Sequence, residues 1–465
     1  MDFKITDLSK YKHIHLIGIG GVSMSAIAKT LHQWGFKVTG SDASPNEFTD
    51  KLIESGIKVT FGHDLTNSRN ADLIVYSAAI NSSDPEIVIA KQSGIPLVTR
   101  GEFVGYLTRR YKDSICVSGT HGKTTTTSMI SICFLEAKTD PTIQVGAILK
   151  QIDGNYTVGN SDYFILEACE YKDNFLKFSP KAEVILNIDN DHLDYFKDME
   201  HVNLAFKKYV KLLPANGLLV VNIDDENCSN LAKYTEAKTI TFGINNQKAN
   251  FVARNITFNK NGYPTFDCYY NNNFYKTFSL SVTGYHNVYN ALACISVCHI
   301  YGLNKEQIKN GLYKFTGAHR RFEFVGKFGN NVEVYDDYGH HPTEIKATAA
   351  AAKNKSFNKS WVIFQPHTYS RTLNLLSDFA KALTLFDNII VTDIYAAREK
   401  NTYNISSQDL VNEINKLGRK AYYIQDFNEI ADFVKSHALN NDLVVTLGAG
   451  TVTEISKLLV DSIEE

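Results

Sequence analysis

The strongest constraint on the fold is a pattern of apolar strand, glycine-rich turn and helix that begins anew along the chain. The apolar run Ile14–Ile17 is followed by such a turn and by a helix-period stretch, Val22–Trp34. The order begins again at Ile115–Val117, with a helix predicted over Thr124–Leu135. Apolar strands that alternate with helices are typical of parallel, doubly wound sheets. We therefore expect an α/β protein.

Three domains of this kind fit a chain of 465 residues, at roughly 100–200 residues per domain. We expect an N-terminal Rossmann-like doubly wound sheet in residues 1–105, a central P-loop ATPase-like α/β domain with added antiparallel strands in residues 106–317, and a C-terminal Rossmann-like α/β domain in residues 318–465. The nearly alternating run Phe266–Tyr270 indicates the antiparallel strands. Further strands are predicted at Lys37–Gly40, Leu73–Tyr76, Ile95–Val98, Phe164–Leu166, Val184–Leu186, Val332–Tyr335, Trp361–Phe364, Ile389–Val391 and Leu443–Leu447, and a further helix at Asn287–Ile300.

Composition excludes several other classes of protein. Hydrophobic residues make up 44% and charged residues 21% of the chain, which is normal for a soluble globular protein. The formal net charge of -2 gives no general attraction to nucleic acid. No apolar run approaches the ~20 residues of a membrane span, and the polar N-terminus lacks the apolar core of a signal peptide. Seven scattered cysteines without a C-x-x-C pair favour buried thiols over disulfides. We expect a cytoplasmic protein with no nucleic-acid partner and no membrane insertion.

A phosphate-binding loop is the strongest local signal. It follows a predicted strand and opens a helix, which is the context that such a loop requires. Backbone N–H groups and the helix N-terminus would face phosphate oxygens, while Lys123 would reach the β- and γ-phosphates and the Thr124 hydroxyl would bind Mg²⁺. Val117 stands where the standard loop has its first glycine, so the alternative is a glycine turn with a chance Gly-Lys-Thr. The loop residues are Gly119, Thr120, His121, Gly122, Lys123, Thr124 and Thr125.

Two more polar residues follow strands of the same predicted sheet. Glu167 comes directly after Phe164–Leu166, and His192 lies just past the strand that ends near Ile188. Ligands of open parallel sheets bind beyond the carboxyl ends of the strands, so we expect both side chains to meet the phosphate loop. A carboxylate, a hydroxyl and an imidazole suit one or two divalent cations. Taken singly, Glu167 could be a surface acid and His192 a loop histidine.

The N-terminal turn resembles a dinucleotide-binding loop. Its sequence is Gly18-Ile19-Gly20-Gly21-Val22-Ser23-Met24, with Ser23 in the place of the third glycine. A diphosphate would rest on the helix N-terminus, and Asp42, at the end of the next strand, would hold ribose hydroxyls. The alternative is an NAD(P)-dependent oxidoreductase, although a second nucleotide loop follows in the same chain.

Two polar runs in the third block follow predicted strands and should lie at the same edge of that sheet. They are Asp336–Glu344 and Gln365–Arg371. Arg371 could bind a carboxylate through two parallel hydrogen bonds, and Arg320 with Arg321 could neutralise phosphate. The adjacent histidines His340 and His341 could instead indicate a metal site.

Taken together, these runs resemble the Mur ligase family, and most closely its alanine-adding branch. The matching pieces span nearly the whole chain. They are Gly18–Met24, Gly119–Thr126, Glu167–Glu170, Asp191–Asp194, Gly284–Ala293, His319–Glu323, Asp336–Ile345, Phe364–Thr372, Thr392–Ala397 and Thr446–Gly450. Two departures are Thr368, where some members carry Arg, and Tyr171–Asn174, where many members have a serine-rich segment.

The resemblance implies domains that bind a UDP-sugar, ATP and an amino acid, in that order. It implies ATP and Mg²⁺ as cofactors, UDP-N-acetylmuramate and L-alanine as substrates, and a place in the synthesis of bacterial peptidoglycan precursors. Lys123, Glu167, His192 and His340 would be catalytic, and Thr124, Glu167 and His192 would bind Mg²⁺. For ATP, the resemblance places His286, Asn287 and Asn290 near adenine, Arg321 near phosphate and Asp337 near the ribose. The UDP-sugar would contact Gly20, Gly21, Val22, Ser23, Met24 and Asp42. Alanine and the reacting carboxylate would lie among Tyr338, His340, His367 and Arg371.

The implied reaction is ATP-dependent amide-bond formation through an acyl phosphate. Because acyl phosphates hydrolyse readily, water must be kept out, and we expect domain closure. Three alternatives stay open on the sequence alone. They are a Mur-type ligase that attaches a whole tripeptide, the NAD(P)-dependent oxidoreductase, and a nucleotide-gated regulator without chemistry.

Overall fold

A computed structural model describes residues 5, 7–77, 80–191, 195–329, 331–397 and 399–460. The chain divides into two compact units, each assembled from several segments. The first unit comprises Met1–Ile188, Val202–Thr241 and Ser296–Leu303, and the second comprises Asp189–His201, Phe242–Ile295 and Asn304–Glu465.

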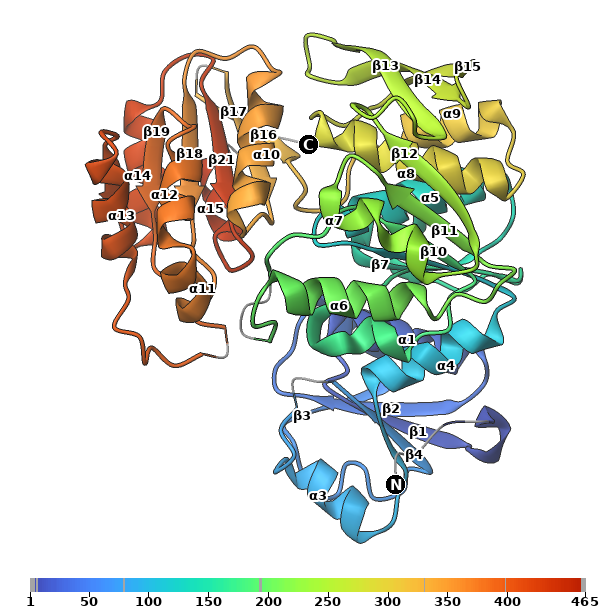
Figure 1. Ribbon diagram of the computed structural model, residues 1–465. Helices are drawn as coiled ribbons and strands as arrows, with labels where there is room; N and C mark the ends of the chain where they lie inside the picture. Colours follow the sequence, from blue (N-terminus) through green and yellow to red (C-terminus); the bar gives the residue numbers. More distant parts are fainter. Residues whose placement is uncertain are drawn as a thin grey trace. The chain divides into compact units, whose positions relative to one another are not determined.

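The N-terminal sheet lies in the first unit and is parallel throughout, in the order β3-β2-β1-β4-β5 (Figure 1). The chain moves from β1 to β2 on one side and later returns to β4 on the other, so the direction of winding reverses at β1. The glycine turn follows β1 at this switch point, where ligands of such sheets bind. The strands are β1 (His13–Ile17), β2 (Lys37–Asp42), β3 (Lys58–Phe61), β4 (Leu73–Tyr76) and β5 (Leu97–Thr99), and the helices are η1 (Leu8–Lys10), α1 (Val22–Gln33), α2 (Glu47–Glu54), α3 (Pro85–Gln92) and α4 (Arg100–Arg110).

A second, larger sheet contributes six strands to the first unit, in the order β11-β10-β6-β9-β7-β8. All of these pairs are parallel except β7 with β8. Helix α5 is buried along nearly its whole length, and the hydroxyls of Thr127, Ser128 and Ser131 donate to carbonyls one turn earlier in the helix. The elements are β6 (Asp113–Ser118), α5 (Lys123–Glu136), β7 (Thr142–Leu149), η2 (Lys150–Ile152), β8 (Gly154–Thr157), β9 (Tyr163–Glu167), η3 (Tyr171–Lys177), β10 (Ala182–Ile185), α6 (Met199–Val210), β11 (Leu218–Asn222), α7 (Glu226–Ser229) and η4 (Leu231–Tyr234).

Antiparallel strands are present where the alternating sequence predicts them. In the second unit β13 pairs with β14, and β14 with β15, in antiparallel fashion. The cross-strand partners Phe251 and Tyr270 stack with ring centroids 4.6 Å apart, the kind of pair that stabilises a sheet. The elements between residues 238 and 314 are β12 (Lys238–Gly243), β13 (Phe251–Phe258), β14 (Pro264–Tyr270), β15 (Asn273–Ser279), α8 (His286–Ile300) and α9 (Lys305–Lys314), and the residues of β12 and of α8 are divided between the two units.

The third sheet lies in the second unit, in the order β16-β17-β21-β18-β19-β20. Only the edge strand β16 runs antiparallel to its neighbour. The elements are β16 (Glu323–Phe328), β17 (Val332–Asp337), α10 (Pro342–Lys353), β18 (Ser360–Phe364), α11 (Tyr369–Asn374), α12 (Leu376–Leu383), β19 (Asn388–Val391), α13 (Ser407–Lys416), β20 (Ala421–Tyr423), α14 (Phe427–His437), β21 (Leu443–Leu447) and α15 (Thr453–Leu459).

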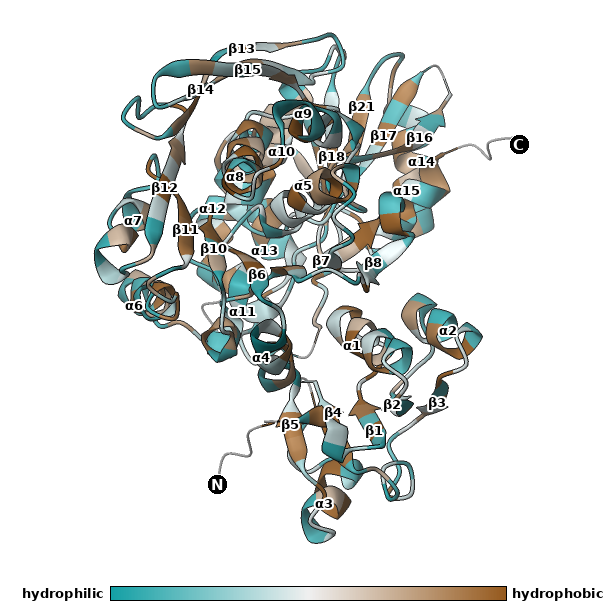
Figure 2. Ribbon diagram, turned by 90° about the vertical axis from the view of Figure 1, so that its right-hand side faces the viewer, coloured by the Kyte–Doolittle hydropathy of each residue, from teal (hydrophilic) through white to brown (hydrophobic). Residues whose placement is uncertain are grey.

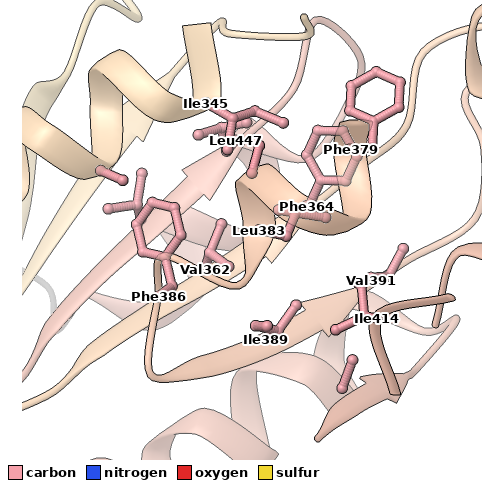
Figure 3. Close-up of a cluster of buried hydrophobic side chains, with 14 of the residues drawn as sticks. Ile345, Val362, Phe364, Phe379, Leu383, Phe386, Ile389, Val391, Ile414 and Leu447 are labelled. Atoms are coloured by element: carbon pink, nitrogen blue, oxygen red, sulfur yellow. The ribbon is translucent and has the colours of Figure 1, made fainter. Parts of the chain in front are cut away.

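Strand β18 shows why this sheet must be covered on both faces. Val362 and Phe364 point into one hydrophobic cluster, together with side chains of α10, α12 and α13 (Figure 3). Trp361 and Ile363 point into another cluster, with side chains of α14 and α15. Successive residues of a strand face opposite sides, so a continuously apolar strand belongs in the middle of a three-layer sandwich. The same brown, apolar colouring marks β1, β5 and β11 in Figure 2.

The structure confirms the α/β class with three sheets, and it corrects several predicted bounds. Strand β5 begins at Leu97 rather than Ile95, since Pro96 has no N–H to donate to a ladder. Glu167 and Asp337 are the last residues of β9 and β17, not residues that follow them. All seven cysteines are free thiols. No helix among the described residues combines the length and apolarity that crossing a membrane requires. The domain bounds at residues 105 and 317 stay predictions.

Candidate active site

The phosphate loop connects β6 to α5 in the backbone geometry that its glycines make possible. Gly119 and Gly122 have positive φ angles of 131° and 87°, in the region that favours glycine. Asn187, which follows β10, holds the loop: Thr120 N–H donates to its backbone carbonyl (3.0 Å) and His121 N–H to its side-chain oxygen (2.7 Å). The N-terminus of α5 therefore follows a fixed glycine turn, as an anion site requires.

Lys123 begins α5, and its ammonium is surrounded by acceptors. It donates to the carbonyl oxygens of Gly119 and Thr120 (3.0 Å for Thr120) and faces the Glu170 carboxylate at 3.1 Å. Burial alone would lower the pKa of Lys123, but the carboxylates of Glu170 and Glu167 outweigh it and raise that pKa above its ordinary value. The lysine is therefore a fixed positive charge at physiological pH.

Thr124 and Glu167 meet as the sequence predicts. The Thr124 hydroxyl donates to Glu167 Oε2 at 3.2 Å, and the other carboxylate oxygen of Glu167 accepts the N–H of Gly146 on β7. A hydroxyl and a carboxylate at this separation suit a hard divalent cation such as Mg²⁺. Thr125 lies next in the first turn of α5. His192, the third predicted ligand, lies outside the described residues.

The N-terminal glycine turn is held by the acid that ends β2. Gly20 N–H donates to Asp42 Oδ2 (2.7 Å), and Ala43 N–H donates to Asp42 Oδ1 (2.8 Å). Gly21 is the N-cap of α1, so Val22, Ser23 and Met24 form its first turn. Met24 is buried, with 2% of its surface exposed, so its side chain packs in the core, and its place in a UDP-sugar site stays a prediction. Asp42 and the turn are thus together, as expected.

The residues predicted near adenine are together at the start of α8. Asn287 is buried and donates through its amide to the Thr283 carbonyl (2.7 Å). Asn290 donates to the Asn287 side-chain oxygen (2.8 Å). His286 is the first residue of the same helix. The two amides therefore keep a fixed orientation on one helical turn.

Asp337 ends β17 and accepts two backbone N–H groups, those of Gly339 (2.7 Å) and Phe322 (2.9 Å). Burial raises the pKa of its carboxyl to about 6, against the opposing charge of Arg321. Arg321 itself lies 5.3 Å from the centroid of the Tyr338 ring and 3.8 Å from Glu344 Oε1. Asp337 and Arg321 therefore share one edge of the third sheet.

Four residues predicted around the amino acid do meet in the second unit. The ring of His340 lies 5.5 Å from that of Tyr338 and 5.6 Å from that of His367, between centroids. Arg371 donates to His367 Nδ1 (3.2 Å) and to Asp191 Oδ1 (3.0 Å). Burial lowers the pKa of His367 to about 4, helped by the neighbouring His340 and Arg371, and burial also lowers the pKa of His340. Both shifts favour the neutral form of the ring.

Several residues at these sites were missed by the sequence reasoning. Glu170 lies within a matching run but was given no role, although it is the ion-pair partner of Lys123. Asn187 was missed although it directly follows a predicted strand. Arg100 was also missed, although its position directly after β5 is the same kind of signal, and it contacts Ser23. Gln144 lies in β7, a strand that the sequence did not predict, so no signal pointed to it.

Comparison with known proteins places the chain in one family. Three family models match in succession: the Mur ligase family catalytic domain over residues 13–112, the Mur ligase middle domain over residues 117–298, and the Mur ligase glutamate ligase domain over residues 320–450.

Individual relatives agree over nearly their whole length. The UDP-N-acetylmuramate–L-alanine ligase of Acetivibrio thermocellus is 47% identical over 456 residues, covering 98% of this chain and 97% of that protein. The protein with the same name from Alkaliphilus metalliredigens is 46% identical and covers 98% of both chains. Among solved structures, the UDP-N-acetylmuramate–alanine ligase of Thermotoga maritima has a TM-score of 0.82 and 30% identity, and covers 97% of this chain and 98% of its own. The chain belongs to the Mur ligase family.

Proposed function

We propose that the protein joins L-alanine to the carboxylate of UDP-N-acetylmuramate in an ATP-dependent reaction, as a step in peptidoglycan precursor synthesis. The observation that carries this proposal is the phosphate loop with Lys123, Thr124 and Glu167 gathered at its helix N-terminus. Relatives named for this reaction, at 46–47% identity over nearly the full chain, support the choice of substrates.

The first step transfers the γ-phosphoryl group of ATP to a carboxylate oxygen of the sugar, giving an acyl phosphate and ADP. Two anions must approach each other, and the fixed positive charge of Lys123 reduces their repulsion. Thr124, Glu167 and His192 would hold Mg²⁺, which would supply further positive charge at the phosphates. The backbone N–H groups at the start of α5 orient the phosphate oxygens.

In the second step the amine of alanine attacks the acyl carbon, and the bond from that carbon to the phosphate oxygen breaks. We infer that Arg371 binds the amino acid's carboxylate by a charge-assisted pair of hydrogen bonds. His340 donates its Nδ1–H to the Tyr338 carbonyl (3.1 Å), which leaves the Nε2 lone pair available. We infer that this nitrogen receives the proton that the amine loses.

The test is phosphate release from ATP with Mg²⁺ and UDP-N-acetylmuramate, with one acceptor added at a time. We expect release with L-alanine that depends on the UDP-sugar, and a product whose mass equals the substrate plus alanine less water. Efficient use of a tripeptide instead of L-alanine would identify the tripeptide-attaching branch. Nicotinamide binding without ATP turnover would overturn the ligase proposal, and ATP turnover indifferent to the UDP-sugar would favour the regulator.

A further inference from the structure

A polar cluster in the first unit lies beside the N-terminal glycine turn and is not used by the reaction steps above. Its centre is the hydroxyl of Ser23, in the first turn of α1. Gln144 Nε2, from β7, donates to Ser23 Oγ at 2.6 Å, and Arg100 Nη1, from the start of α4, donates to it at 3.2 Å. Three elements that are distant in the sequence therefore meet at one hydroxyl group.

Gln144 carries an acceptor that nothing in the described part of the chain satisfies. Its side-chain oxygen Oε1 is buried and has no hydrogen-bond donor there, and only 8% of the residue's surface is exposed. Leaving such an oxygen without a donor is destabilising, because its hydration is lost without replacement. Orphaned buried polar atoms are rare in folded proteins and call for an explanation. A ligand N–H group would supply the missing donor.

Arg100 has the opposite imbalance, an excess of donors. A guanidinium offers five N–H donors, and the contact with Ser23 uses one of them. Burial lowers the pKa of Arg100, and no carboxylate among residues with a described position forms an ion pair with it. A partly buried guanidinium without a carboxylate is suited to an oxygen acceptor that arrives with a ligand.

The position of the cluster limits which part of a ligand it can touch. On one side Ser23 follows the glycine turn, where a diphosphate is expected. On the other side Gly146, two residues after Gln144 on β7, donates its N–H to Glu167, which in turn contacts Thr124. The cluster thus lies between the expected diphosphate and the expected ATP site. For a UDP-sugar, the part that connects these two places is the amino sugar ring.

We propose that Gln144 and Arg100 recognise the acetamido group of the sugar. The acetamido N–H donates to Gln144 Oε1, and Arg100 donates to the acetamido carbonyl oxygen. One planar amide offers a donor and an acceptor on separate atoms and so satisfies both imbalances at once, whereas a free ammonium has no acceptor for Arg100. The pair acts as a specificity determinant, and the proposal rests on the function proposed above.

The experiment compares UDP-N-acetylmuramate with its N-deacetylated analogue, in alanine-dependent phosphate release and in calorimetric binding without ATP. The wild-type protein should prefer the acetylated substrate by about 100-fold in kcat/KM, a value expected for two lost hydrogen bonds of which one is charge-assisted. Gln144→Leu and Arg100→Lys should each raise KM for the acetylated substrate by about tenfold with little change in kcat. Both should reduce the preference for the acetylated substrate.

Control variants separate recognition from folding. Arg109→Lys, at an exposed position of the same helix as Arg100, should behave as the wild type. Gln144→Glu keeps the shape and an oxygen acceptor, so it should retain part of the preference. If Gln144→Leu and Arg100→Lys weaken both substrates equally, the cluster only joins the elements and the inference is wrong, while the ligase proposal stands. If the wild-type protein forms no product from UDP-N-acetylmuramate, the ligase proposal fails and the inference fails with it.

Discussion

Replacing Lys123 with Met should damage activity and stability for different reasons, and the structure allows the two to be separated. The Lys123 ammonium faces the Glu170 carboxylate at 3.1 Å, and the Glu170 side chain is only 2% exposed. Removing one partner of a buried ion pair costs about 3–5 kcal/mol, because the other charge stays buried. Loss of one key transition-state contact lowers turnover by at least ~100-fold, or about 2.7 kcal/mol. Lys123→Met should therefore show both losses.

The double variant Lys123→Met/Glu170→Gln removes both charges and should recover most of the stability but none of the turnover. The assays are urea unfolding for stability and alanine-dependent phosphate release for activity. Lys381→Ala, at a lysine whose side chain is 61% exposed, is the matched control and should change neither. Recovery of turnover in the double variant would refute the argument, since it would mean that Lys123 serves only to balance Glu170.

Three further predictions concern the pH response, the core and the metal ligand. Burial lowers the pKa of His367 from 6.5 to about 4, so this side chain binds a proton more readily in the unfolded chain. The free energy of unfolding should therefore decrease as the pH is lowered from 6.5 to 4. Thermal unfolding of His367→Gln should show a smaller fall. Phe364→Ala should cost about 3–5 kcal/mol in urea unfolding, because Phe364 is fully buried between helices and sheet, whereas Leu373→Ala, at a 42% exposed position, should cost little. Gly146→Ala would place a Cβ atom 2.7 Å from a Glu167 oxygen and displace that carboxylate. It should therefore raise the Mg²⁺ concentration needed for half-maximal turnover, and an unchanged value would contradict a metal role for Glu167.

The sequence was sufficient for the parts of the site that depend on one rule. The carboxyl ends of parallel strands lie at the same edge of a sheet. That rule alone predicts that Glu167 lies close to the phosphate loop, where it contacts Thr124, a residue 43 positions earlier in the sequence. The same rule would also have found Arg100, which directly follows β5.

Contacts that depend on how two sheets pack were beyond that reasoning. Gln144 reaches Ser23 across 121 positions, from a strand whose register no local pattern reveals. The pairing of Lys123 with Glu170 depends on the turn after β9. In that turn Lys172 and Asp173 have positive φ angles, which their residue types do not predict. Propensity and periodicity describe single elements. The contact of Gln144 with Ser23 arises only when elements of two sheets pack together, whereas the pairing of Lys123 with Glu170 depends on a turn within one sheet.

One hydrogen-bonding arrangement occurs in all three sheets. It distinguishes between acids that their positions in the sequence do not distinguish. A carboxylate at the end of a strand accepts the N–H of a glycine on which a Cβ atom would lie 2.7–2.9 Å from a carboxylate oxygen. The pairs are Asp42 with Gly20, Glu167 with Gly146 and Asp337 with Gly339. In Asp42 and Asp337 a second backbone N–H holds the other oxygen, so these acids fix loops and can add only a further hydrogen bond from a ligand hydroxyl. The second oxygen of Glu167 is held by a side-chain hydroxyl, that of Thr124, which a cation can share without disturbing any backbone bond. Of the three acids, we therefore expect Glu167 to be the one that binds a metal ion.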